Sequence, residues 1–133
     1  MNIFYLDQNP KQSAQYHCSR HVVKMILESA QMLCTAIRII GGKPIVLLTP
    51  NNRKKLVYML PNETYKWVDN KLILSSGLYI QTHANHPCSI WVRKSFANWN
   101  YVWNLMYALD TERQFRYSHN KEHKSIITLK YVN

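Results

Sequence analysis

The sequence predicts a mainly α-helical fold, a small single-domain bundle in which two long helices flank an irregular insert. Two long stretches carry apolar residues at spacings of three and four, and Gly or Pro bounds each stretch. Between them, residues 41–82 are instead punctuated by Gly, Pro and Asn. The chain has 133 residues, 47% of them apolar, so we expect residues 1–133 to form one domain with a hydrophobic core.

The first long helix is predicted from Asn9 to about Ile40. Pro10 suits a first turn, and Gly41 and Gly42 end the helix. One face holds the apolar positions, which are Val22, Ile26, Ala30, Leu33 and Ile37. The short apolar opening of the chain, residues 1–6, leads through a turn into this helix, so we expect it to lie close to the helix start.

The remaining elements are less regular, apart from a second long helix. The insert, approximately residues 41–82, holds short apolar runs, and we expect irregular structure that can include a β-hairpin. The runs are Pro44 to Leu48, Leu56 to Leu60 and Leu72 to Ser75. The second long helix is predicted from Pro87 to about Arg116, with an apolar face formed by Val92, Phe96, Trp99, Val102, Met106 and Leu109. The last apolar run, Ile126 to Val132, predicts a short helix or strand.

The charge of the chain is strongly basic, because 17 Lys and Arg residues outnumber 7 Asp and Glu residues. Such a domain is typical of proteins that bind a polyanion, with nucleic acid as the first candidate and an acidic protein as the alternative. No apolar run approaches the roughly 20 residues of a membrane span. The first residues show no charged stretch followed by an apolar one, so we expect no leader. Three cysteines without a CxxC pair are typical of a reducing compartment. We expect a cytoplasmic protein of a bacterium or a phage-infected cell, without a membrane partner.

Polar residues form one line on the first predicted helix, opposite its apolar face. They are His17, His21, Lys24, Glu28, Gln31 and Thr35. Glu28 and Asp7 are the only acidic residues among the first 62. A carboxylate on a basic surface repels phosphates, so its position indicates a catalytic role for Glu28. The alternative is an ordinary ion pair with Lys24, one helical turn away.

A second basic and aromatic segment opens the second predicted helix. Arg93 and Lys94 can bind phosphates, and Trp91 can stack on a base or belong to the core. The six histidines allow a His-ligated metal site as an alternative, because they form three sequence pairs: His17 and His21, His83 and His86, His119 and His123. The sequence has no Walker loop, GxGxxG or GxSxG motif, which leaves nucleotide hydrolysis, dinucleotide redox chemistry and serine hydrolysis without support.

Two blocks of the sequence together carry a family resemblance. The first block consists of Met1-Asn2-Ile3-Phe4, Arg20-His21-Val22-Val23 and Glu28, seven residues after the histidine. The second extends from His86-Pro87 through Trp91, Arg93 and Lys94 to Arg116-Tyr117 and His119. With these blocks, a little over half of the chain resembles the small all-α pyrimidine-dimer DNA glycosylases with AP-lyase activity, of the phage endonuclease V type.

The resemblance implies a mechanism that requires no metal or other cofactor. In that family the α-amino group of the mature amino terminus attacks C1′ of the damaged nucleotide and forms a Schiff base, which leads to strand cleavage. The amine would belong to Met1, or to Asn2 after removal of Met1. An α-amine has an ordinary pKa of about 8, so a useful fraction is nucleophilic at neutral pH. Glu28 would stabilise the developing sugar cation and assist proton transfer.

The implied substrate is damaged double-stranded DNA, from which the enzyme extrudes a base. We expect a monomer whose DNA-binding residues are His17, Arg20, His21, Lys24, His86, Trp91, Arg93 and Lys94. The sequence departs from the family at Leu27, where an arginine is typical, and in the insert. Two other function classes stay open: a non-catalytic basic DNA-binding accessory protein, and a His-ligated metal enzyme that acts on nucleic acid or a modified base.

Overall fold

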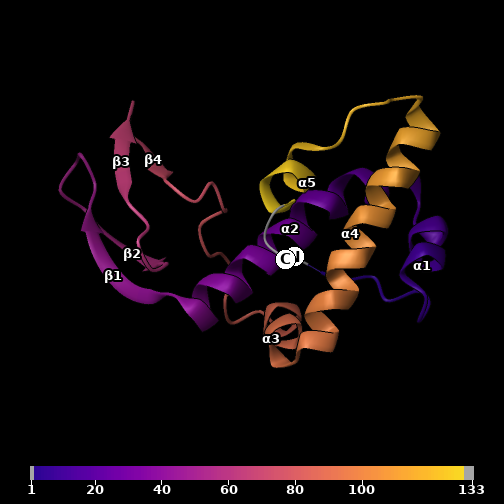
Figure 1. The fold of residues 1–133 in the computed structure, drawn as a ribbon, viewed down its shortest axis with the longest axis horizontal. Coiled ribbons are helices and arrows are strands. Elements are labelled where there is room, and N and C mark those ends of the chain that lie inside the picture. The colour runs from indigo at the N-terminus through magenta and orange to yellow at the C-terminus, as the bar shows by residue number, and fades with distance from the viewer. Residues whose placement is uncertain (1, 131–133) are drawn as a thin grey trace.

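The computed structural model describes residues 2–130, which form five helices and two two-stranded antiparallel sheets (Figure 1). In chain order the elements are α1 (Pro10–Tyr16), α2 (Ser19–Gly41), β1 (Lys43–Leu48), β2 (Lys54–Met59), β3 (Tyr65–Val68), β4 (Lys71–Leu74), α3 (Pro87–Lys94), α4 (Phe96–Tyr117) and α5 (Lys124–Leu129). The prediction of a mainly α bundle was wrong, because the fold is a mixed one with 51% helix and 16% strand. None of the helices within residues 2–130 is long and apolar enough to cross a membrane.

The strands lie in the insert, which forms two β-hairpins where mostly irregular structure was expected. β1 pairs with β2, and β3 pairs with β4. The second hairpin turns at Asp69 and Asn70, whose φ angles are 52° and 64°. Asp and Asn tolerate this left-handed conformation, which a two-residue type I′ turn requires. The hairpins bury a small apolar cluster of their own, formed by Leu47, Val57 and Met59.

Each of the two long predicted helices is divided in two. The chain is extended at His17 and Cys18, so α1 ends before α2 begins. The apolar repeat of the first stretch starts at Val22 and lies entirely within α2, so it carried no information about residues 9–18. Ser95 is likewise extended and separates α3 from α4. Its Oγ accepts a hydrogen bond from the backbone amide of Asn98 at 3.1 Å, so Ser95 caps the start of α4 directly after α3 ends.

The helical core surrounds α2, which packs against α3, α4 and α5, while α1 packs against α4. Figure 1 shows the helices gathered together and the two hairpins extending beyond the end of α2. The last apolar run begins as a helix, α5, and residues 131–133 lie outside the described residues. The fully buried side chains of the core include Val22, Ile26, Leu33, Val102, Met106, Leu109, Ile126 and Leu129.

Arg38, near the end of α2, joins this core to the insert. Its guanidinium group donates hydrogen bonds to the carbonyl oxygens of Tyr58 at 3.0 Å, Leu78 at 2.9 Å and Tyr79 at 2.8 Å. It also forms a bidentate ion pair with Glu63. The side chain of Arg38 is completely buried, so one residue fixes β2, the loop after it and the segment after β4 against the helices.

Candidate functional site

The polar line predicted on the first helix has buried ends and an accessible middle. His17 and Thr35, at the two ends, are 3% and 0% exposed. Between them, the side chain of Lys24 is 64% exposed and that of Glu28 is 15% exposed. His21 and Gln31 are partly exposed. Only the stretch from His21 to Gln31 can therefore meet a ligand.

Glu28 lies in the centre of this stretch. Its Oε2 is 3.9 Å from Nζ of Lys24 on the next turn of α2. Ion pairs of this kind on a helix surface stabilise a protein by only about 0.3–0.5 kcal/mol. The ion pair between Lys24 and Glu28 that the sequence suggested is therefore present. Its small contribution to stability does not explain why a basic protein keeps the Glu28 carboxylate largely out of solvent.

The amino-terminal segment packs against the start of this face. The ring of Phe4 stacks on His21 with centroids 4.5 Å apart and an angle of 14° between the planes. The carbonyl oxygen of Phe4 accepts a hydrogen bond from the Ser13 hydroxyl at 3.2 Å, and the same hydroxyl accepts one from the Leu6 amide. The Tyr101 hydroxyl donates to the carbonyl oxygen of Asp7 at 2.7 Å. Residues 4–7 are thus held by α1, α2 and α4.

The chain just before Phe4 lies beside the start of α3. His21, Glu28 and Thr35 follow one another at intervals of seven residues, which keeps them on one face of α2. Thr82, which precedes α3, exchanges hydrogen bonds with Thr35 at 3.1 and 3.3 Å. Ile3 lines a surface pocket of about 450 Å³ with residues at the start of α3, Pro87 and Cys88.

Phe4 therefore lies beside His21 on α2, and Ile3 lies beside the start of α3. Asn2 is exposed. Met1, which the resemblance implies as the alternative carrier of the catalytic amine, lies outside the described residues.

His17 is a packing residue rather than an exposed DNA ligand. Its Nδ1 donates a hydrogen bond to the Ser13 carbonyl oxygen at 2.6 Å, and its Nε2 has no hydrogen-bond partner among the described residues. Burial lowers the pKa of His17, the Ser13 bond opposes this effect, and the nearby His21 and Arg116 lower the pKa further. The ring is therefore neutral at pH 7. Arg116 also holds the corner between α1 and α2, through bonds to the carbonyl oxygens of Gln15 and His17.

The other predicted DNA ligands divide into exposed and structurally engaged side chains. Arg20 and Lys94 are exposed, like Lys24. Arg93 donates to the Ala84 carbonyl oxygen at 2.6 Å and so fixes the loop before α3. Trp91 is partly exposed, lines the 450 Å³ pocket and meets the ring of Tyr5 edge-on at 6.5 Å. Arg20, Lys24 and Lys94 are thus the cations that remain available for phosphates.

Two of the histidines have a role that the sequence analysis missed. Nδ1 of His86 accepts a hydrogen bond from the Cys88 amide at 3.1 Å and caps α3. Nδ1 of His123 accepts one from the Ser125 amide at 3.0 Å and caps α5 in the same way. The sequence signal was their place directly before each helix. Within residues 2–130, no group of three or more His, Cys, Asp or Glu side chains could hold a metal ion, so the predicted histidine pairs do not combine there into a metal site.

Comparison of the chain with protein families, curated proteins and solved structures finds no match in any of the three. Two features of the molecule point to a function: the face of α2 that holds Glu28, and the amino-terminal segment beside the start of that face.

Proposed function

We propose that this protein is a DNA repair enzyme, a pyrimidine-dimer-type DNA glycosylase with AP-lyase activity that uses an amino-terminal amine and Glu28. The observation that carries the proposal is the stacking of Phe4 on His21, on the same face of α2 as Glu28. Glu28 follows His21 by seven residues, which is about 10 Å along a helix. An extended chain advances about 3.3–3.6 Å per residue, so the residues before Phe4 span a distance of the same order. An amine at the start of the chain has the reach to act beside Glu28.

The chemistry needs one nucleophile and one carboxylate. The amine forms a bond to C1′ of the damaged nucleotide, and the glycosidic bond breaks with its electron pair leaving on the base. Loss of the amine proton and opening of the sugar ring at O4′ give the imine. Removal of a proton from C2′ then expels the 3′ phosphate, and water releases the sugar from the amine. Glu28 would stabilise the sugar cation in the first step and move protons in the later ones, and burial strengthens both effects.

The substrate follows from the surface around this site. The chain carries a formal net charge of +10, and Arg20 and Lys24 lie exposed on the turns of α2 before Glu28. Phosphates of a DNA duplex would bind these cations. Because the fold is mixed rather than all-α, the proposal rests on the site and not on the architecture that the family resemblance implied.

Incision of a duplex that carries one cyclobutane thymine dimer, assayed in EDTA, tests the proposal. We expect cleavage at the dimer by the unmodified protein and a loss of about 100-fold or more in Glu28→Gln, with unchanged duplex affinity. Glu112→Gln is the matched control, because Glu112 is also in an i,i+4 pair and its side chain is 18% exposed. Cleavage that survives Glu28→Gln, or no cleavage by the unmodified protein, would contradict the proposal.

A second candidate is a non-catalytic DNA-binding protein, which the contact between Lys24 and Glu28 favours. In that case Glu28 only orients a phosphate-binding lysine. This candidate predicts salt-dependent binding without preference for a lesion and without incision.

A further inference from the structure

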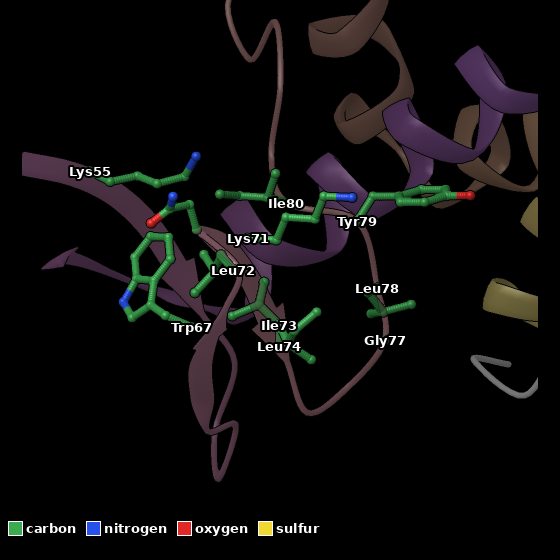
Figure 2. A pocket seen from close by; sticks show the side chains of 11 residues that line it. Lys55, Trp67, Lys71, Leu72, Ile73, Leu74, Gly77, Leu78, Tyr79 and Ile80 are labelled. Carbon is green, nitrogen blue, oxygen red and sulfur yellow. The ribbon is translucent and has the colours of Figure 1, made fainter. Parts of the chain in front are cut away.

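The insert contains a groove that the proposed chemistry does not use. It has a volume of about 550 Å³ and lies between β2, the second hairpin and residues 77–80 (Figure 2). Figure 2 shows Lys55 and Trp67 at one end of the groove, and Lys71 extending toward Tyr79 at the other. Apolar side chains such as Leu72 lie between the two ends. The groove thus combines an apolar floor with a partly exposed tryptophan and two exposed lysines.

The charge around this groove is positive. None of its described lining residues is acidic. Residues 43–82 contain six Lys and Arg residues and two acids, Glu63 and Asp69. Glu63 is buried against Arg38, so it offers no carboxylate to the surface. An anionic ligand therefore suits this groove.

The groove is also held in shape before any ligand binds. Its wall at Leu78 and Tyr79 is fixed by the bonds from Arg38 to their carbonyl oxygens. The Tyr79 hydroxyl lies 3.1 Å from Oγ of Ser125 in α5, which adds a second attachment to the helical core. A preformed site loses less conformational entropy on binding than a flexible one.

We propose that this groove binds single-stranded nucleic acid, with a base stacked on Trp67 and backbone phosphates bound by Lys55 and Lys71. Aromatic faces beside a basic groove are the combination that binds unpaired bases without regard to sequence. Bases within a duplex are already stacked on each other and cannot use the indole. An acidic peptide would use the lysines but gain nothing specific from the aromatic face. This binding does not depend on the chemistry proposed at Glu28.

Fluorescence anisotropy with a labelled thymidine decamer and the full chain tests the proposal. Lys55→Gln with Lys71→Gln should weaken binding about tenfold and reduce the slope of log affinity against log salt by about 1.4, since each lost phosphate contact contributes about 0.7 on single strands. Lys54→Gln with Lys66→Gln removes the same charge from side chains that do not line the groove. This control pair should change affinity less than threefold. Equal effects of the two pairs would overturn the proposal.

Substitutions of Trp67 test the proposed stacking of a base on its indole ring. Trp67→Leu should weaken decamer binding about tenfold with an unchanged salt slope, and Trp67→Phe should restore most of the affinity. Circular dichroism establishes that both variants fold. Unchanged affinity in Trp67→Leu, or equal competition by polyglutamate at the same charge concentration, would overturn the proposal in favour of a binder of acidic chains. Dimer incision is measured on a duplex and decamer binding on a single strand, so a failure of one proposal is distinguishable from a failure of the other.

Discussion

Arg38 and Glu63 form a bidentate ion pair that is completely enclosed between α2 and the insert. The two guanidinium nitrogens lie 2.7 and 2.9 Å from the carboxylate oxygens. The two side chains are 0% and 1% exposed. Each of these buried charges is stabilised by the other and not by water, so removal of one leaves the other buried without its counterion.

We predict that Glu63→Gln lowers the free energy of unfolding by about 3–5 kcal/mol, because it leaves the Arg38 charge uncompensated. Chemical denaturation at pH 7 measures the change. Glu122→Gln is the control, since the side chains of Glu122 and Lys130 form a pair at 2.8 Å that is about 40% exposed. Surface pairs contribute about 0–1 kcal/mol. A loss in Glu63→Gln no greater than in Glu122→Gln would show that the pair does not hold the insert.

The same pair predicts how stability depends on pH. Burial alone raises the pKa of Glu63, but hydrogen bonds from Arg38, Ser76 and the Leu60 amide outweigh it and lower the pKa from 4.5 to about 2. The folded state therefore binds this proton less tightly than the unfolded state. The contribution of the carboxylate is complete above pH 4.5 and is lost as the pH falls toward 2.

Denaturation curves of the unmodified protein and Glu63→Gln across this range test the sign of the effect. The difference in unfolding free energy should be constant from pH 7 to about 5 and then shrink toward pH 2. A difference that grows on acidification would contradict the assigned pKa direction.

Gly42 and Gly41 provide a matched test of the junction between α2 and β1. A Cβ at position 42 would lie 2.5 Å from the Arg38 carbonyl oxygen and 3.0 Å from that of Met59, both of them backbone atoms. We predict that Gly42→Ala destabilises the protein by about 1–3 kcal/mol. At position 41 the nearest atom is a Leu60 methyl at 3.9 Å, so Gly41→Ala should cause no loss. Thermal unfolding of both variants checks this, and equal melting temperatures would count against the close approach.

His123 predicts a separate effect of mild acid. Burial lowers its pKa, Arg113 lowers it further, and Asp110 opposes both. The contribution of His123 to the free energy of unfolding is therefore complete above pH 6.5, its ordinary pKa, and declines as the pH falls below that value. Protonation removes the Nδ1 acceptor that caps α5.

His123→Asn keeps a capping oxygen that does not titrate. We expect this variant to match the unmodified protein at pH 7.5 and to be the more stable of the two at pH 5. His119→Asn, at an exposed position after α4, should keep the original pH dependence. If His123→Asn loses as much stability on acidification as the unmodified protein, a group other than His123 causes the loss.

The elements that the sequence predicted well are those with a long apolar repeat. Val22 to Ile37 marked α2, and Val102 to Leu109 marked the buried part of α4. The break at His17 and Cys18 was missed because the apolar repeat starts only at Val22. The break at Ser95 was missed because one extended residue barely disturbs a helical repeat. The insert was underestimated because its strands have four to six residues, too few for a clear alternation.

The candidate site was predicted in part for a similar reason. Spacing alone placed His21, Lys24 and Glu28 on one face, and the structure has them there. Spacing could not show that His17 is turned into the core, which depends on the extended backbone before α2. Nor could it pair Arg38 with Glu63, because the two residues are 25 positions apart in the sequence and an arginine in the last turn of a helix is usual.

Borohydride trapping on a duplex that carries a thymine dimer tests the central claim most directly. In EDTA, the unmodified protein should form a covalent adduct, and peptide mapping should place it on the first residue of the chain. Glu28→Gln should greatly reduce the adduct, and Glu112→Gln should retain it. An adduct on a lysine side chain, or no adduct on the dimer duplex while DNA binding persists, would contradict Schiff-base chemistry and leave a DNA-binding protein without this catalysis.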